Sequence, residues 1–377
     1  MKRILPAALL LLAFYAVADH PVSAQDQLYY ISPETRKEVK DPLIGKIKAE
    51  SPGGVTITVG KEDKVIPALD VVQIAFKTVK SGLSDYRSPY GNIENALKTN
   101  VKTDGKKRRD FFTKALKDLT EVSSRDLKDN SFAERYIQYR IAEIQYRIAM
   151  DDGQRTQAIK AMEDYTSLYK DGWEIVPALK TLARLHEDGN DVTKALATLE
   201  RLADLPGVPK EIKREGNVAV SQMLMRAKRY PEAEKRLMVL LDSLPPGDAA
   251  RAATQVYLVQ TQVAQKKTEG AEKNLKDAIA GTNDALLRGM AYNGLGDYYR
   301  EKGQTEEAFW QYLRVDTLYN LDAHEHAKAI YHLSELFKVK KFGDRTGDPI
   351  RAKTYRERLQ DKRFEETEYP KLVPKEP

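Results

Sequence analysis

Histidines, paired carboxylates and tryptophans are the side chains whose type and spacing could carry chemistry in this chain. His324, His326 and His332 form the histidine cluster. On a helix, residues two positions apart point about 200° apart, so His324 and His326 cannot chelate one ion together. An extended segment would allow it, but no matched carboxylate lies nearby. We therefore expect no metal site and interpret the three residues as surface histidines at a helix start.

Paired carboxylates occur at Asp151-Asp152 and Glu365-Glu366, in predicted loop or tail positions that are exposed to solvent. Acid–base catalysis needs two such groups held at a fixed separation in a cleft, and nothing near these pairs predicts one. Phosphate-binding Walker loops, Gly-x-Ser-x-Gly elbows and His-Glu-x-x-His motifs do not occur in the sequence. Trp173 and Trp310 are interpreted as packing residues. The sequence thus predicts a protein without catalytic residues, cofactors or metals.

The N-terminus predicts export. Lys2 and Arg3 precede an apolar stretch that runs from Ile4 to Ala18, and Val22-Ser23-Ala24 places small residues at the −3 and −1 positions of a cleavage site. The stretch of about 15 apolar residues is shorter than the roughly 20 needed to cross a bilayer, although an uncleaved anchor is the alternative. We predict a signal peptide over residues 1–24 and a periplasmic or extracellular mature protein that begins at Gln25, without stable membrane insertion.

Composition limits how the protein is stabilised and what it binds. The 377 residues include no cysteine, so disulfides and thiolate sites are excluded and stability must come from burial. The 62 basic and 56 acidic residues are finely interspersed, which is typical of solvated helix faces and does not predict nucleic-acid binding. The densest basic run, at residues 106–109, is interpreted as a solvated loop before a helix.

The elements expected to position these side chains fall into consecutive regions. Residues 25–40 are polar without clear periodicity and are interpreted as a leader arm. Residues 41–80 contain β-branched segments separated by Gly and Pro turns, which predicts four or five short strands in a small, strongly bent antiparallel barrel-like module. Their order resembles the SH3-like or Sm-like β-modules of some exported bacterial proteins. Residues 88–364 have helical periodicity, and residues 365–377 are predicted to form a flexible tail.

A periodic alanine is the most informative feature of the helical region. Five alanines recur at spacings of 37, 38, 38 and 37 residues: Ala158, Ala195, Ala233, Ala271 and Ala308. Two more flank them, Ala115 at 43 residues before the first and Ala352 at 44 residues after the last. Two helices that cross closely accept only a small side chain at the crossing. The spacing therefore predicts six or seven helical hairpins, each with an alanine at its crossing.

One unit also resembles a known repeat. Tyr292, Leu295-Gly296 and Tyr299, followed by Ala308 and Tyr312, resemble the tetratricopeptide repeat, in which an aromatic residue, a Leu-Gly pair and a tyrosine precede an alanine and an aromatic residue. The period here is three or four residues longer than the usual 34, and the Leu-Gly pair is intact only in this unit. The resemblance implies a mainly α fold, an α-α hairpin superhelix of tetratricopeptide type that follows the β-module.

The resemblance further implies that partners bind on the concave side, which the first helix of each hairpin lines. Its groove positions correspond in this sequence to Tyr136, Tyr139, Tyr146, Lys180, Arg184, Gln222, Met225, Gln260, Asn293, Asp297, Arg300, Lys328 and Tyr331. Tyrosines suit an interface because they combine an apolar ring with a polar tip. Alternatively, the tyrosine-rich face of the first of these units packs on the β-module or on the next hairpin.

These observations predict an exported, non-catalytic scaffold that binds protein or peptide segments in the cell envelope. Two other classes remain open at this point. One is a glycan-binding protein or an enzyme with an unrecognised site, and the other is a structural subunit that assembles with itself. The sequence does not identify the partner, the biological process or the oligomeric state.

Overall fold

The computed structural model describes residues 25–32, 34–35, 37–76, 83–125, 131–339, 341–342, 345–364 and 367–373. The chain divides into two compact units, which meet within one helix between Ala219 and Val220, and each is described by itself. We call them the N-terminal and the C-terminal unit. The predicted signal peptide lies outside the described residues. None of the described helices combines the length and the apolar character needed to cross a membrane.

Five antiparallel strands open the N-terminal unit, in the order β4-β3-β2-β1-β5, with β4 and β5 at the edges. Their bounds are β1 (Asp26–Tyr30), β2 (Leu43–Ser51), β3 (Gly54–Val59), β4 (Glu62–Pro67) and β5 (Val71–Ala75). The interpretation of residues 25–40 as a leader arm is wrong for β1, which pairs with both β2 and β5 and buries Leu28. Only Leu28 of its five residues is buried, so the strand does not show the alternation of apolar and polar side chains that would have revealed it.

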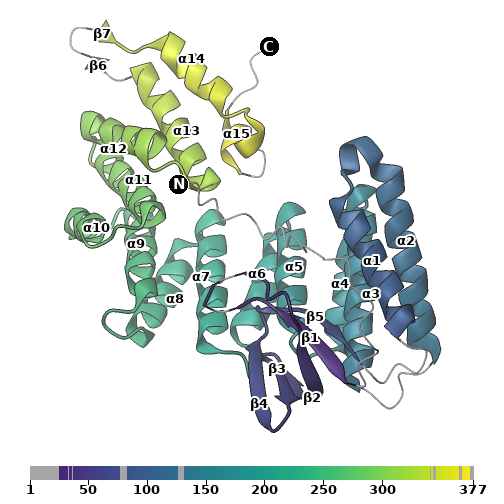
Figure 1. The fold of residues 1–377 in the computed structure, drawn as a ribbon. Coiled ribbons are helices and arrows are strands. Elements are labelled where there is room, and N and C mark those ends of the chain that lie inside the picture. The colour runs from purple at the N-terminus through teal and green to yellow at the C-terminus, as the bar shows by residue number, and fades with distance from the viewer. Residues whose placement is uncertain are drawn as a thin grey trace. The chain divides into compact units, whose positions relative to one another are not determined.

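Seven consecutive helical hairpins follow in the described part of the chain, as the alanine spacing predicted (Figure 1). They are α1 (Leu83–Lys98) with α2 (Val101–Arg125), α3 (Ser131–Asp151) with α4 (Arg155–Leu168), α5 (Ile175–Asp188) with α6 (Val192–Ala203), α7 (Lys210–Arg226) with α8 (Tyr230–Ser243), α9 (Ala249–Ala264) with α10 (Ala271–Ala280), α11 (Ala285–Glu301) with α12 (Thr305–Leu318), and α13 (Ala323–Val339) with α14 (Pro349–Arg358). The short strands β6 (Lys341–Phe342) and β7 (Arg345–Thr346) lie between α13 and α14, and the 3-10 turn η1 (Lys362–Phe364) and α15 (Tyr369–Leu372) follow. The predicted fold class, an α-α hairpin repeat behind a small β-module, is confirmed.

The crossing alanines confirm the register of the repeat. All five lie on the second helix of their hairpin and are at most 2% exposed, and the flanking Ala115 and Ala352 are equally buried. A Cβ added at Gly296 would come within 2.5 Å of the Tyr312 ring. The Leu-Gly pair therefore exists because the α11 backbone must approach a buried tyrosine on α12.

The five hairpins whose crossing alanines are Ala158 to Ala308 share one backbone conformation in the turn between their helices. A residue with positive φ stands five positions before each crossing alanine: Gly153, Asn190, Lys228, Lys266 and Gly303. The N–H that follows it donates to the carbonyl oxygen five residues back, at 2.7–2.9 Å in all five turns. This is the Schellman arrangement, which satisfies carbonyl groups left over at a helix end. Side chains as different as lysine and glycine thus occupy equivalent positions, which hides the turn period from sequence composition.

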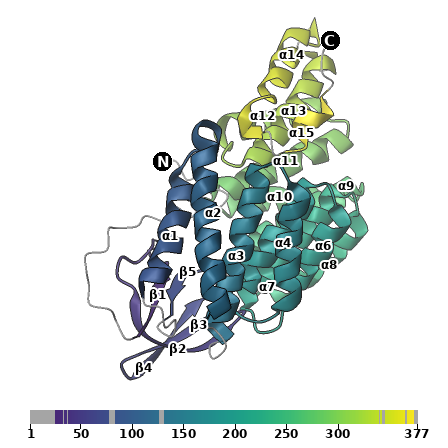
Figure 2. The same cartoon turned by 90° about the vertical axis from the view of Figure 1, so that its right-hand side faces the viewer.

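The N-terminal core joins the sheet to the helices. Leu28, Ile57, Phe112 and Tyr136 belong to one buried cluster, and in Figure 2 the strands lie beside α1 and α3. The backbone N–H of Ile74 in β5 donates to the Tyr136 hydroxyl at 3.4 Å. The sheet therefore shares its core with the first hairpins and is not an independent domain in packing terms.

The predicted flexible tail is also corrected where it is described. Tyr369 and Val373 are buried in a cluster with Phe364 and with Ala327 and Ile330 of α13. A few apolar side chains within an otherwise polar segment are enough to hold it against a helix. Residues 365–366 and 374–377 lie outside the described residues.

Candidate functional site

The first helices of the C-terminal unit lie side by side. α11 contacts both α9 and α13, and the end of α7 meets α9 through the Gln222 amide, which donates to the Tyr257 hydroxyl. These are the helices to which the resemblance assigned the binding groove. We call the surface that carries Gln222, Tyr257, Asp297, Lys328 and Tyr331 the first-helix face.

Several of the predicted groove residues connect neighbouring helices. The Gln260 amide donates to the carbonyl oxygen of Met290 at 2.8 Å and so connects α9 to α11. The fully buried Asn293 amide donates to the carbonyl oxygen of Glu325 at 2.8 Å and to its carboxylate at 2.6 Å, which connects α11 to α13. Gln260 and Asn293 were predicted to contact a partner, and the structure corrects this, because both side chains are buried and engaged in packing the repeat.

A charged pair lies at the centre of the face. The Lys328 ammonium is 2.6 Å from the Asp297 carboxylate, which also accepts a hydrogen bond from the Tyr312 hydroxyl at 2.7 Å. Burial by itself would raise the pKa of Asp297, but Lys328 and the nearby His332 lower it below its ordinary value. Burial also lowers the pKa of His332 to about 3, so that this ring is neutral at pH 7. The result is a fixed ion pair on α11 and α13.

A polypeptide segment already lies against this face, and it comes from the chain itself. The Tyr369 ring packs against the rings of His324 and Tyr331 of α13, at centroid distances of 5.3 and 5.7 Å. Burial raises the pKa of the Tyr369 hydroxyl well above its ordinary value, and the charges of Glu368, Glu325 and Asp297 add to this. The contact with Tyr331 places Tyr369 on the first-helix face.

Other predicted groove residues of this unit remain accessible. The Arg300 side chain is 48% exposed and lies 3.9 Å from Asp297. Met225 and Tyr331 are partly exposed, at the end of α7 and in the middle of α13. An arginine, a methionine and a tyrosine with open surface are typical of protein interfaces.

The predicted groove residues of the N-terminal unit divide in the same way. Tyr136 and Tyr139 are buried, and both rings lie 6.1 Å from the ring of Trp173. The alternative interpretation, packing inside the unit, therefore applies to these two tyrosines. Tyr146 is half-buried against the core of the α3–α4 hairpin, the Lys180 ammonium lies 2.8 Å from Glu215, and Arg184 is exposed on α5.

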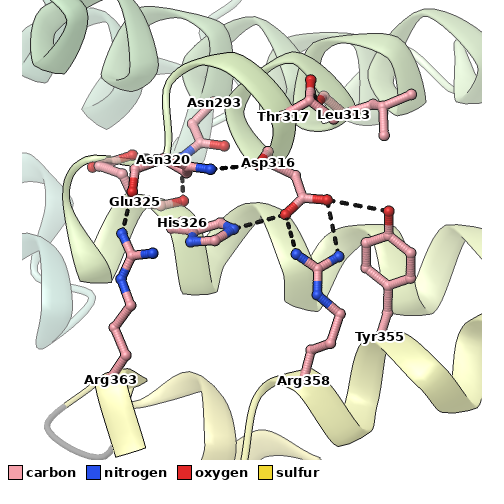
Figure 3. Close-up of polar contacts among 10 residues, drawn as sticks. All are labelled: Asn293, Leu313, Asp316, Thr317, Asn320, Glu325, His326, Tyr355, Arg358 and Arg363. Carbon is pink, nitrogen blue, oxygen red and sulfur yellow. Dashed lines mark hydrogen bonds and ion pairs between the residues drawn. The ribbon is translucent and has the colours of Figure 1, made fainter. Parts of the chain in front are cut away.

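Two of the three histidines, His326 and His332, are not surface residues, which corrects that interpretation for them, whereas the His324 side chain is 38% exposed. His326 and His332 are buried because α13 packs against both α12 and α14. His326 and Arg358 contact the same carboxylate of Asp316, to which the Tyr355 hydroxyl also donates at 3.2 Å (Figure 3). No group of three or more metal-ligating side chains comes together among the described residues.

The Asp151-Asp152 pair forms ion pairs with the basic run at residues 106–109. The Arg108 guanidinium lies 2.6 Å from Asp151 and the Arg109 guanidinium 2.7 Å from Asp152, so these ion pairs join α2 to the end of α3. Arg108 and Arg109 lie on α2 and not in a solvated loop, which corrects the prediction for this segment. Their partner carboxylates are only 20% exposed.

Two residues had no counterpart among the predicted ones, one on the face and one packed against it. Tyr257, on the face, lies three residues before the predicted Gln260. Tyr369 lay in the segment interpreted as tail, where the sequence Tyr-Pro-Lys-Leu-Val was the only apolar signal.

Comparison with known proteins concerns the fold. No family model and no curated protein matches the chain. A solved tetratricopeptide repeat protein from Parabacteroides merdae is 15% identical, over 67% of this chain and 91% of that one, with a TM-score of 0.43. BtubC (BKLC) from P. vanneervenii is 16% identical over 63% and 94% of the two chains, with a TM-score of 0.38. The TPR domain of P58(IPK) is 14% identical over 75% and 84%, with a TM-score of 0.28.

The class of protein follows from the hairpins themselves. Crossing alanines in register, five equivalent turns and first helices that lie side by side define a helical repeat of tetratricopeptide-like fold.

Proposed function

We propose that this protein is a non-catalytic scaffold that binds protein segments on its first-helix face. The observation that carries the proposal is that this face already holds a polypeptide segment, residues 367–373, through a buried tyrosine. A surface that buries an aromatic side chain of one segment has the geometry needed to anchor the side chain of another. Arg300 on α11 and Met225 on α7 are partly accessible residues of first helices and supply additional contact area.

Affinity capture with the mature chain tests this proposal. Arg300→Ala combined with Met225→Ala removes two accessible side chains of the face and leaves the buried contacts between helices intact. Since alanine favours helix, helicity should persist, while capture of the partner should weaken by about 1–3 kcal/mol if these are interface residues. The control is Lys273→Ala with Lys276→Ala on α10, two exposed lysines in pairs of helix spacing. Equal capture by both variants and by the unmodified chain would place binding elsewhere.

We also propose that the protein is exported and acts in the cell envelope. The support is the sequence of residues 1–24, with two basic residues, an apolar stretch and small residues before Gln25. Mass spectrometry of the protein recovered from cells should find Gln25 at its N-terminus. Recovery of the intact chain from the cytoplasm would contradict export without touching the binding proposal.

A further inference from the structure

The segment on the first-helix face has a defined chemistry. Its carboxylate, Glu368, lies 3.2 Å from the Nε2 atom of His324, and the charges of His324 and Arg226 help to lower its pKa, although burial opposes this. The next residue, Tyr369, is only 8% exposed, and Val373 adds a buried apolar side chain. A contact between a carboxylate and a histidine, an aromatic site and an apolar contact therefore follow one another along the segment.

We propose that residues 367–373 occupy a peptide-binding site on α13, and that a partner segment with the same chemistry competes with them for it. The partner would present a carboxylate, then directly an aromatic residue, then apolar residues. This inference rests on the proposed scaffold function and specifies its ligand.

The two segments exclude each other for a steric reason. The rings of His324 and Tyr331 that contact Tyr369 offer one aromatic site, so a second aromatic side chain can enter only after Tyr369 leaves. The segment can leave α13 without unfolding a helix of any hairpin, because it follows η1 in the chain and is not itself part of a hairpin.

The contacts also define which aromatic residue fits. Tyr369 is only 8% exposed and belongs to a buried apolar cluster with Ala327 and Ile330. A neutral phenol is accepted there, whereas a phosphorylated tyrosine would bring about two negative charges into a site that excludes water. Tyrosine phosphorylation of the ligand should therefore weaken binding.

The expected size of the competition follows from effective concentration. A segment attached through a short linker competes at an effective concentration on the order of millimolar. If a free peptide binds the open face with a dissociation constant of about 0.1 mM, the attached segment weakens its apparent affinity by about tenfold.

A direct measurement uses a fluorescent peptide with the sequence of residues 367–373, Thr-Glu-Tyr-Pro-Lys-Leu-Val. Fluorescence anisotropy compares its binding to the full chain and to a chain that lacks residues 367–377. We expect the shortened chain to bind at least about tenfold more tightly. In the shortened chain, Tyr331→Ala should remove most of the binding, and Lys273→Ala with Lys276→Ala should leave it unchanged. Peptides with alanine or phosphotyrosine in place of the tyrosine should bind at least about tenfold more weakly.

Two results would overturn the inference: equal peptide binding by the full and the shortened chain, or binding to the shortened chain that is insensitive to Tyr331→Ala. If the shortened chain does not fold, the full chain with Tyr369→Ala replaces it, because that variant loses the aromatic contact and keeps the rest of the segment. It should gain peptide affinity in the same direction, and no gain would count against the inference.

Partner capture separates this inference from the proposed function. If the captured partner is lost with Arg300→Ala and Met225→Ala but gains nothing from removal of residues 367–377, the scaffold function stands and the competition is wrong. If the peptide binds as expected but neither chain captures a partner, the site on α13 stands and the proposed scaffold function fails.

Discussion

At pH 8, replacing Arg135 by methionine is expected to destabilise the N-terminal unit by about 3–5 kcal/mol, since removing one partner of a buried ion pair leaves uncompensated charge. Arg135, on α3, lies between two carboxylates. Its guanidinium contacts Glu50 at the end of β2 and lies 3.2 Å from Glu174, and both carboxylate side chains are 0% exposed. This cluster links the sheet to two hairpins through charges that have no access to water.

The pH dependence of the variant gives this prediction a sharper form. One guanidinium cannot neutralise two buried carboxylates, and burial and their mutual repulsion raise the pKa of Glu50 to about 8. Burial likewise raises the pKa of Glu174, to about 7. A carboxyl group with a raised pKa in the folded state stabilises the fold below its unfolded pKa, and this contribution is lost as the pH rises through the folded value. Stability contributed by this cluster should therefore decline between about pH 5 and pH 8.

Without Arg135, both carboxyl groups must stay protonated in the folded state, so the cost of the substitution should grow once the pH passes about 7, where the groups of the unmodified chain begin to ionise beside Arg135. Chemical denaturation of the unmodified chain and of Arg135→Met at pH 5, 6.5 and 8 measures this. Arg184→Met is the matched control, because its side chain is 54% exposed and lies 3.9 Å from Asp188 at helix spacing, so the substitution should cost under about 0.5 kcal/mol. Glu50→Gln should flatten the decline. Parallel profiles of Arg135→Met and the unmodified chain between pH 6.5 and 8 would refute the assignment.

The second large effect is expected at Asp316, whose replacement by alanine should destabilise the last hairpin by about 2–4 kcal/mol. The carboxylate of this α12 residue is 2.7 Å from His326 of α13 and 3.0 Å from Arg358 of α14, and it accepts from Tyr355 as well (Figure 3). Alanine would leave these three groups without their shared acceptor. The range is set below that of a fully buried pair because the Arg358 side chain is 38% exposed.

Local opening is the suitable measurement, since repeat proteins lose stability mainly in the damaged unit and its neighbours. Hydrogen exchange should accelerate in α13 and α14 of Asp316→Ala and stay unchanged in α9. Burial opposes ionisation of Asp316, but His326 and Arg358 prevail and lower its pKa to about 2. Its contribution is therefore present above about pH 4 and lost as the pH falls toward 2. Asp277→Ala, at an exposed pair on α10, is the control; exchange that is equally fast in both variants would contradict the prediction.

The sequence by itself determined the repeat and its register. A small residue is required wherever two helices cross closely, and this local requirement recurs once per hairpin, so Ala158 to Ala308 reveal the period without any knowledge of distant contacts. Gly296 carries the same kind of information, because a glycine is required there by a single neighbouring ring, that of Tyr312.

Only the tertiary structure decided which side chains of a helix face are available. Tyr136, Tyr139 and Asn293 stand at the positions that the resemblance assigned to the groove, yet β5, Trp173 and α13 cover them. Helical spacing specifies the direction of a side chain and not what lies there, because the covering elements come from remote parts of the chain. For the same reason β1 and Tyr369 were not recognised: each is a short segment stabilised by long-range pairing or packing, which leaves no period in the sequence.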